Sequence, residues 1–290
     1  MSDRKTECKR LVRRVVPLNV RKLAARTLQR CNWIDPQRRH WWSVELVRDL
    51  AETNVDAFHQ FLWTYHLGYA ESYEVAGRFG TDKVRASRRL FFSDLRDQVA
   101  QPGTFSDGGV KSIFEVGCSL GYQLRHIETD VFPGVIELAG IDIDRYAVEA
   151  GRKFLRSVGS KVALQCGDTR DLERWLGGKR YDIIICTGVL MYLNEAAARE
   201  VVGTMLRHSR LLALAGLAHP RINNADLDRS DVRASDSSFI HNFDRMVTDH
   251  GGRVLWRRWE GDRNVEGNTI YFVFATGAEP AKHAHASNSG

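Results

Sequence analysis

The stretch that decides the fold runs from Lys111 to Ile127 and reads K-S-I-F-E-V-G-C-S-L-G-Y-Q-L-R-H-I. Its first part, Ile113 to Val116, is a mostly apolar run, which predicts a buried strand. Glycines follow, and the apolar residues Leu120, Leu124 and Ile127 then recur at the spacing of an amphipathic helix. Backbone N–H groups at the start of such a helix can approach a ligand closely. The stretch therefore predicts the cofactor-binding corner of an open α/β sheet.

The residues of this turn exclude one cofactor class. The dinucleotide pattern G-x-G-x-x-G would need three glycines, but the second and third positions are Ser119 and Tyr122. Glu115 precedes the first position, Gly117, and a carboxylate there gains nothing from an anionic pyrophosphate. It suits a cationic ligand that carries hydroxyl and amino groups.

The run Glu115-Val116-Gly117-Cys118-Ser119-Leu120-Gly121 resembles motif I of the class I S-adenosylmethionine (SAM) dependent methyltransferases. The usual form of that motif is Asp/Glu-x-Gly-x-Gly-x-Gly, and Ser119 stands here at the middle glycine. The resemblance implies SAM as the cosubstrate. It also implies a cofactor loop that includes Glu115, Gly117, Cys118, Ser119 and Gly121.

The segment V-I-E-L-A-G-I-D-I-D, residues 135–144, predicts a second strand that ends at Asp142. At this end of a second strand an adenosine ribose presents two hydroxyls, and a carboxylate can accept both hydrogen bonds. Asp142 also matches the Gly-Ile-Asp form of the family motif, and its neighbour Ile143 joins the predicted cofactor site. Asp144 is interpreted as the N-cap of the next helix.

Two further strands end in family-like positions. Residues 162–166 predict a third strand, followed by Gly167-Asp168-Thr169, where the family places an Asp that hydrogen-bonds the adenine amino group. A loop aspartate that caps the next helix would give the same pattern. Residues 181–186 form a continuous apolar run, as buried parallel strands require. The resemblance places the following Thr187-Gly188 along the methyl-donor side of the cofactor.

The rest of the chain completes an α/β fold. A fifth strand is predicted at 211–217, and a closing hairpin at 253–260 and 268–276. The expected fold class is therefore a Rossmann-like, seven-stranded, mostly parallel sheet with an antiparallel terminal strand, preceded by a helical segment. In the family this sheet is commonly ordered 3-2-1-4-5-7-6. The polar stretch 218–238 is long for a connection between two elements, which is typical of lids or disordered loops.

Composition divides the chain into three parts. Residues 1–105 predict an N-terminal helical segment, made of a basic arm (1–40) and aromatic-rich lid helices (41–100). Residues 106–278 form the expected SAM-binding domain, and 279–290 a polar tail. In similar small-molecule methyltransferases such a segment folds over SAM, and a Tyr or Arg from it meets the methionine end. Tyr73 and Arg78 are the candidates for that contact, with Tyr69 beside them.

The net charge of +6 is unevenly distributed. Residues 1–40 hold 12 of the 42 Lys and Arg but only 3 of the 36 Asp and Glu, so the remainder has a net charge of −3. A body that leans acidic argues against a nucleic-acid substrate. The amphipathic basic stretch 9–30 fits either a solvated helix on the main domain or a peripheral contact with an anionic membrane.

Methyl transfer needs a general base only when the acceptor must lose a proton. His219, His241 and Tyr192 are the candidates, by their positions after the predicted fifth strand, after the polar stretch and after the fourth strand. Either histidine could equally be satisfied by loop backbone. Five cysteines without zinc-type spacing predict free thiols and no metal site.

The expected function is a SAM-dependent methyltransferase for a small-molecule acceptor, a secondary metabolite or a sugar-like hydroxyl or amine. The alternatives are an RNA, carrier-protein-bound or membrane-linked substrate held by the basic arm, and a non-catalytic SAM-binding partner subunit. The sequence contains no run of 18 apolar residues, so no transmembrane helix is predicted. A cytoplasmic location is expected. The oligomeric state is left open.

Overall fold

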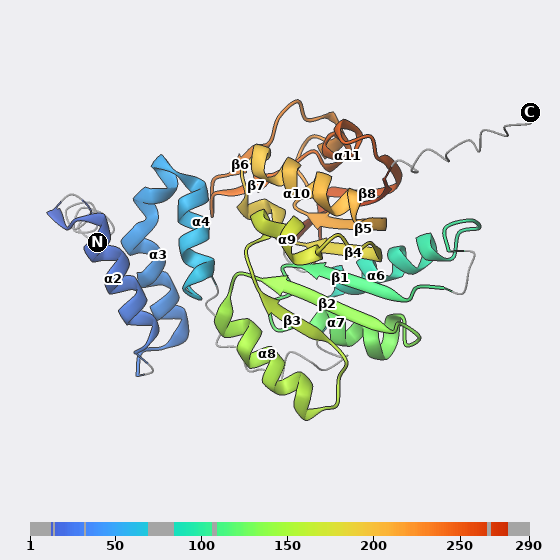
Figure 1. The fold of residues 1–290 in the computed structure, drawn as a ribbon. Coiled ribbons are helices and arrows are strands. Elements are labelled where there is room, and N and C mark those ends of the chain that lie inside the picture. Colours follow the sequence, from blue (N-terminus) through green and yellow to red (C-terminus); the bar gives the residue numbers. More distant parts are fainter. Residues whose placement is uncertain are drawn as a thin grey trace, which may run out of the picture.

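The computed structural model describes residues 13, 15–31, 33–68, 84–105, 109–265 and 268–277. These residues form a central sheet with helices on both faces and a helical lobe at one side (Figure 1).

The sheet has seven strands in the order β3-β2-β1-β4-β5-β9-β8. Strands β1 to β5 are parallel, whereas β9 is antiparallel to both β5 and β8. This is the predicted Rossmann-like sheet with an antiparallel strand at its end, and the prediction is confirmed. The strand bounds are β1 Ser112–Val116, β2 Glu137–Asp142, β3 Ala163–Cys166, β4 Tyr181–Thr187, β5 Ser209–Gly216, β8 Arg253–Val265 and β9 Asn268–Thr276.

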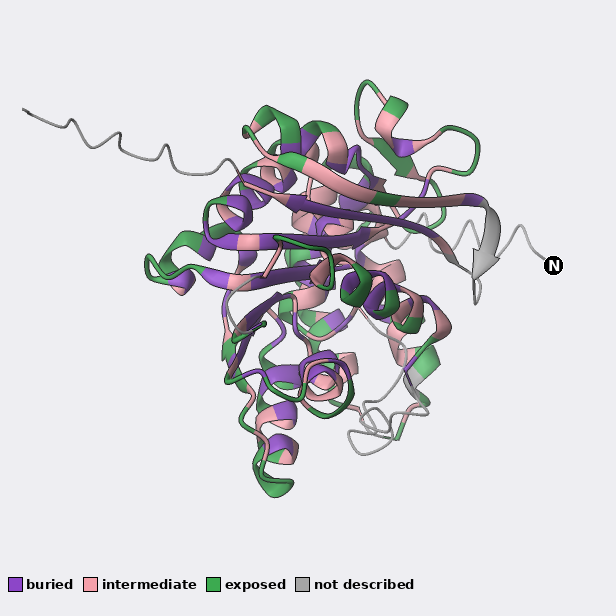
Figure 2. Cartoon of the chain, turned by 90° about the vertical axis from the view of Figure 1, so that its right-hand side faces the viewer, coloured by how far each residue is buried: buried purple, intermediate pink, exposed green. Residues whose placement is uncertain are grey.

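Helices cover both faces of the sheet because its strands are apolar on both sides. In β1, Phe114 and Val116 belong to the core under α9, α10 and α11, while Ile113 belongs to the core under α6, α7 and α8. Figure 2 shows the strands largely buried between these layers. The helices are α6 Ala86–Val99, α7 Tyr122–His126, α8 Arg145–Ser157, α9 Leu172–Leu176, α10 Glu195–Arg207 and α11 Phe243–Asp249, with a π-helical turn Ile127–Val131 and 3-10 turns Thr169–Asp171, Leu190–Tyr192 and Asn224–Asp226.

Helix α6 packs directly on the sheet, although the sequence places it with the lid helices. The ring of Phe91 stacks on Phe274 at 5.5 Å between centroids and meets Phe272 edge-on at 5.2 Å. Asp94, which is buried, accepts two hydrogen bonds from Arg258 of β8, at 2.8 and 2.9 Å. These contacts fix α6 beside the cofactor edge of the sheet.

The N-terminal lobe consists of α2 Leu18–Gln29, α3 Pro36–Thr53 and α4 Val55–Thr64. It has its own core, which includes Ala25, Val47 and Phe58. A buried arginine, Arg21, reaches from α2 to the Asp49 carboxylate of α3 in a bidentate pair at 2.6 and 2.7 Å. Helix α4 lies nearest to the sheet (Figure 1). Among the described residues, no helix has the length and apolarity to cross a membrane.

The polar stretch after β5 contains regular structure. It holds a 3-10 turn, and its end pairs as a two-stranded sheet of β6 Asp231–Arg233 and β7 Ser238–Ile240. The buried Asn224 holds the stretch in place, since its side-chain amide donates to the carbonyls of Leu217 and His241. Helix α11 consequently begins only at Phe243, where the Asn242 side chain accepts from the Arg245 N–H.

Candidate functional site

A cavity of about 500 Å³ lies at the carboxyl ends of the parallel strands. Its wall is built from the loop after β1, the end of β2, the turn after β3 and the segment after β4. Helix α4 and the hairpin β6–β7 contribute to the opposite side, as does α6. The predicted cofactor residues that line it are Gly117, Ser119, Asp142, Ile143, Asp168, Thr169, Thr187 and Gly188.

The loop after β1 has left-handed backbone at two positions that matter for the cavity. Gly117 has φ 79°, and a Cβ there would lie 1.9 Å from Val189 Cγ2, so only glycine fits. Ser119, at the middle glycine position of the motif, has φ 49°. The loop thus keeps its conformation at the cost of a strained serine. Its Ser119 N–H donates to Asp142 Oδ2 at 2.8 Å.

Asp142 connects the first two loops of the sheet. Its Oδ2 accepts from the Ser119 N–H and its Oδ1 from the Asp144 N–H, both at 2.8 Å. Burial raises the pKa of Asp142 to about 6, and these N–H groups oppose that shift. Each carboxylate oxygen keeps acceptor capacity at the cavity wall, as two ribose hydroxyls would require.

Glu115 is fully buried behind the cavity wall and belongs to a polar chain. The Gln123 amide nitrogen donates to Glu115 Oε1 at 2.7 Å and lies 2.8 Å from Thr187 Oγ1. Glu115 Oε2 is buried, and none of the described residues forms a hydrogen bond with it. Burial raises the pKa of Glu115 to about 8, although the charge of Arg88 lowers it. The raised pKa favours the protonated form of Glu115, and a cation placed next to Gln123 and Thr187 in the cavity would favour the ionised form.

Asp168 lies at the far end of the cavity wall. Its side chain accepts from the Arg170 N–H at 3.0 Å and pairs with the Arg170 guanidinium. It is also the N-cap of the 3-10 turn that begins at Thr169. The carboxylate therefore has the capping geometry that the sequence left as an alternative, while it remains part of the cavity wall.

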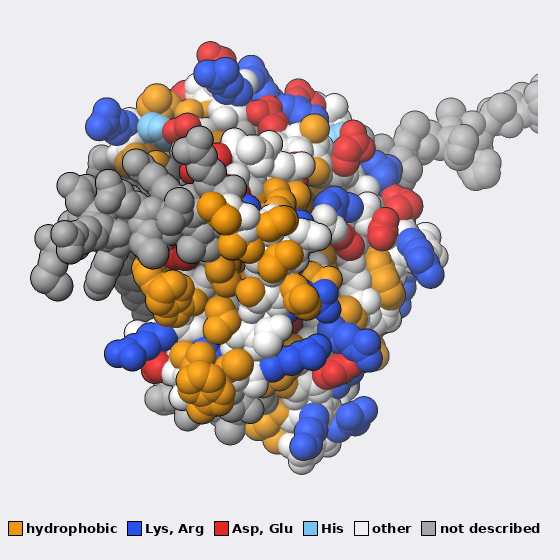
Figure 3. Space-filling view, turned by 90° about the vertical axis from the view of Figure 1, so that its left-hand side faces the viewer, with side chains coloured by type: hydrophobic (Ala, Val, Ile, Leu, Met, Phe, Trp, Pro, Cys, Tyr) orange, Lys and Arg blue, Asp and Glu red, His pale blue; other side chains and the backbone are white. Residues whose placement is uncertain are grey.

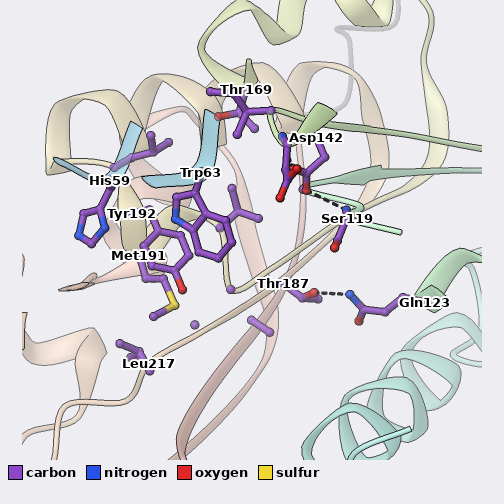
Figure 4. A pocket seen from close by; sticks show the side chains of 18 of the residues that line it. His59, Trp63, Ser119, Gln123, Asp142, Thr169, Thr187, Met191, Tyr192 and Leu217 are labelled. Atoms are coloured by element: carbon purple, nitrogen blue, oxygen red, sulfur yellow. Dashed lines mark hydrogen bonds between the residues drawn. The ribbon is translucent and has the colours of Figure 1, made fainter. Parts of the chain in front are cut away.

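The side of the cavity opposite the carboxylates is aromatic. Trp63 and His59 of α4 lie against Tyr192, with ring centroids 4.8 and 5.0 Å from that of Tyr192. Figure 4 shows these rings and Met191 on one side of the space, and Asp142, Ser119 and Gln123 on the other. Asp56 of α4 holds this arrangement, since its Oδ1 accepts from the Asn194 N–H at 2.8 Å.

Not every predicted residue lies at the cavity. Glu115, Cys118, Gly121 and Gly167 are absent from its wall. Cys118 is part of the core between the sheet and its helices, where burial raises the pKa of its thiol. Tyr73 and Arg78, as well as Tyr69, lie outside the residues that the structure describes.

The three candidate bases have different surroundings. His241 is buried, with Nε2 2.9 Å from the Leu190 carbonyl and Nδ1 2.6 Å from Ser230 Oγ. His219 Nδ1 accepts from the N–H groups of Arg221 and Ile222. Neither histidine lines the cavity. Both form hydrogen bonds with neighbouring loop residues, as the alternative interpretation of these histidines predicts. Tyr192 lines the cavity, but burial raises its pKa to about 12.

Several residues of the cavity were not singled out from the sequence. Gln123 lies in the predicted helix after the glycine loop, and His59 and Trp63 lie in the segment 41–100 that was predicted as aromatic-rich lid helices. Arg88 also lines the cavity. Its guanidinium lies next to Gly188, since a Cβ added to Gly188 would be 3.5 Å from Arg88 Nη2. The only sequence signal for it was the basic run R-A-S-R-R at the start of α6.

Comparisons with known proteins agree with this site. Residues 113–210 match a family model described as a methyltransferase domain. No curated protein matches the chain.

Solved structures with a similar fold include two methyltransferases and a cyclase. Magnesium protoporphyrin IX methyltransferase from Synechocystis PCC 6803 is 16% identical, with 80% of this chain and 96% of that chain covered at a TM-score of 0.47. The cyclase SpnF is 16% identical (68% and 85% covered, TM-score 0.50). A putative RNA methyltransferase from Pyrococcus horikoshii is 15% identical (68% and 84% covered, TM-score 0.44). At such identities the likeness concerns the fold alone.

The domain match, the order of the sheet and the position of the cavity at its carboxyl edge define the class of protein. Residues 113–210 form a methyltransferase domain, and SAM is its methyl donor. The sequence-based predictions of a methyltransferase and of SAM as cosubstrate are thereby confirmed.

Proposed function

We propose that this enzyme methylates a small, flat acceptor that carries a hydroxyl or an amine. The observation that supports the proposal is that one cavity has carboxylates along one wall and aromatic rings along the other. Its volume of about 500 Å³ is typical of small-molecule sites. Aromatic walls favour a planar acceptor, which stacks on them with little loss of conformational freedom.

The wall of the cavity offers a partner to each polar part of SAM. Asp142 would accept hydrogen bonds from the ribose hydroxyls. The cationic methionine amino group would lie beside Gln123, with the buried Glu115 behind it. Arg88 would pair with the methionine carboxylate, because its guanidinium lies next to Gly188 at the same wall. When bound, SAM supplies an electrophilic methyl group on a sulfonium. The residues of the chain hold the acceptor in line with it and exclude water.

The helical lobe would provide the acceptor side of the site. Asp56 binds Asn194 at the start of α10, and His66 Nδ1 lies 2.5 Å from Asp144 Oδ2 beside the ribose end. These contacts tie α4 to both sides of the cavity edge. These contacts support the proposal that α4 covers the cofactor cleft.

The proposal is tested by incubating the enzyme with SAM and a panel of phenols, amines and hydroxylated sugars. Mass spectrometry then measures the conversion of SAM to S-adenosylhomocysteine (SAH). We expect turnover with a planar member of the panel. Trp63→Ala should raise the acceptor KM about tenfold and leave SAH affinity within twofold, because Trp63 belongs to the aromatic wall. SAH binding without methylation of any acceptor would instead favour a non-catalytic subunit.

A second candidate acceptor is membrane-linked. On the helical lobe, Val20, Leu23, Trp41 and Trp42 are large apolar side chains that are 44–62% exposed. Figure 3 shows hydrophobic side chains gathered on this face, with Lys and Arg nearby. Tryptophan and basic residues together favour an anionic bilayer surface.

Sedimentation with vesicles of anionic or neutral phospholipid tests this candidate. The wild-type enzyme should co-sediment with anionic vesicles at low salt, and Leu23→Glu should abolish that binding without changing SAH affinity. Ile136→Glu, at an exposed site directly before β2 and away from the lobe, adds the same single negative charge and is the matched control. Equal binding of both variants, or none by the wild type, would refute the membrane-linked candidate.

A further inference from the structure

A histidine from the helical lobe, His59, lies in the wall of the cavity with one ring nitrogen fixed. Its Nε2 is 2.9 Å from the Ser237 carbonyl oxygen. A carbonyl only accepts, so the neutral ring carries its proton on Nε2. Nδ1 is then the basic nitrogen, and it has no hydrogen bond to any of the described residues.

The carbonyl that fixes this tautomer is itself held rigidly. Ser237 has φ 61°, an unfavourable conformation for a serine. The turn between β6 and β7 maintains it, because the Ser237 N–H donates to the Arg233 carbonyl at 2.9 Å and the Ser238 N–H to Asp236 Oδ1 at 3.1 Å. The strained residue, Ser237, therefore supplies the backbone oxygen that accepts from His59 in the cavity wall.

His59 lies next to the segment after β4, which the family resemblance places along the methyl-donor side of the cofactor. Its ring centroid is 5.0 Å from that of Tyr192, which belongs to the 3-10 turn directly after β4. The end of β4, at Thr187 and Gly188, is part of the same cavity wall. His59 and Tyr192 are adjacent in Figure 4, on the side where an acceptor would be bound.

We propose that His59 is the general base of the reaction and that the acceptor is a phenol or enol. This proposal rests on the small-molecule function given above. Nδ1 takes the proton of the acceptor O–H while an oxygen electron pair forms a bond to the SAM methyl carbon. The C–S bond breaks and its electron pair goes to sulfur, which yields neutral SAH, the methyl ether and an imidazolium. The imidazolium then returns its proton to solvent.

The charges around His59 limit the acceptor class. Burial lowers the pKa of His59, while the Ser237 carbonyl and the carboxylates of Asp236 and Asp56 raise it. Arg233 faces the same space but pairs with Asp236. Such a ring is neutral at pH 7 and only weakly basic, so it matches a phenolic hydroxyl with a pKa of about 10 better than an aliphatic alcohol.

The alternative base in the same wall is Tyr192. Because burial raises its pKa to about 12, Tyr192 keeps its proton at neutral pH. It can donate a hydrogen bond to the acceptor oxygen but cannot remove a proton from it. The proton therefore goes to His59.

The experiment compares His59→Gln with wild type on a series of simple phenols of graded acidity that includes 4-nitrophenol. His40→Gln is the control, because His40 also bonds a backbone carbonyl, that of Leu67, but lies outside the cavity wall. Unfolding curves and SAH calorimetry establish that each variant folds and binds cofactor. Nitrogen-15 NMR of labelled histidine reports the His59 tautomer independently of activity.

We expect His59→Gln to lower kcat on phenols of ordinary acidity by about 10²- to 10⁴-fold, with little change in KM or SAH affinity. The acidic limb of the wild-type pH profile should disappear, and 4-nitrophenol, already ionised at high pH, should restore the rate. His40→Gln should match wild type. An unchanged kcat in His59→Gln, a proton on Nδ1, or methylation of amines but of no phenol would overturn the proposal. Failure to bind SAH would refute the proposed function instead.

Discussion

Replacing Glu115 with glutamine removes a carboxyl group that is completely buried and that folding makes hard to ionise. Burial raises its pKa from 4.5 to about 8. Glutamine has nearly the same shape and keeps an oxygen for the Gln123 amide nitrogen. We therefore expect Glu115→Gln to stabilise the protein in the absence of cofactor and to weaken SAM binding.

The magnitude follows from the two pKa values. Between pH 4.5 and 8 the folded protein keeps this proton, whereas the unfolded chain has lost it, so stability falls as the pH rises. Each pH unit costs about 1.4 kcal/mol, which gives about 3 kcal/mol at pH 7 and about 4 kcal/mol at pH 8, where Glu115 of the folded protein is half ionised. Below pH 4.5 the wild type has no such penalty, and above pH 8 the penalty is constant.

Urea unfolding followed by tryptophan fluorescence, at intervals from pH 5 to pH 9, measures this difference. The free energy of unfolding of Glu115→Gln minus that of wild type should grow over this range and level off near pH 8. Glu200→Gln, on the exposed side of α10, is the control for loss of one carboxylate and should show no such growth. Parallel pH curves for wild type and Glu115→Gln would refute the reasoning.

Three other substitutions test parts of the site and its support. Asp142→Asn should weaken SAH binding about 10- to 100-fold by calorimetry, because charge-assisted hydrogen bonds to the ribose are lost. Ser119→Gly should raise the free energy of unfolding by about 1 kcal/mol, with SAH affinity retained, since the left-handed backbone at this position strains a serine; a loss of stability would contradict that account. Asp94→Asn should lower the free energy of unfolding by about 2 kcal/mol, as it breaks the pair with Arg258, which is only partly exposed; an unchanged urea midpoint would argue against a role for this pair in holding α6.

The cofactor edge of the sheet could be predicted from the sequence because its residues stand at, or directly after, the ends of predicted strands. Parallel strands bring their carboxyl ends to one edge, so Gly117, Asp142 and Thr187 meet wherever the strands pair in order. The close contact between Gly117 and Val189 explains why this position requires glycine.

The acceptor side could not be predicted in the same way. His59 gains its partner Ser237 across 178 positions of sequence, and no local pattern fixes which face of α4 meets the hairpin β6–β7. Spacing pointed to His241 instead, because it follows a long polar stretch. In the structure, His241 lies in the short connection between β7 and α11, where its two ring nitrogens contact Ser230 Oγ and the Leu190 carbonyl.

Helix α6 shows how tertiary packing changes an interpretation based on composition. Its phenylalanines continue the aromatic pattern of the lid helices, yet Phe91 packs on β9. The same placement brings Arg88 to the cavity wall.

A crystal structure of the enzyme with SAH tests the central claim most directly. We predict that the ribose hydroxyls lie within hydrogen-bond distance of the Asp142 carboxylate, with the methionine amino group on the Glu115 side of the cavity. SAH bound elsewhere on the chain, or in this cleft with its ribose turned away from Asp142, would contradict the account.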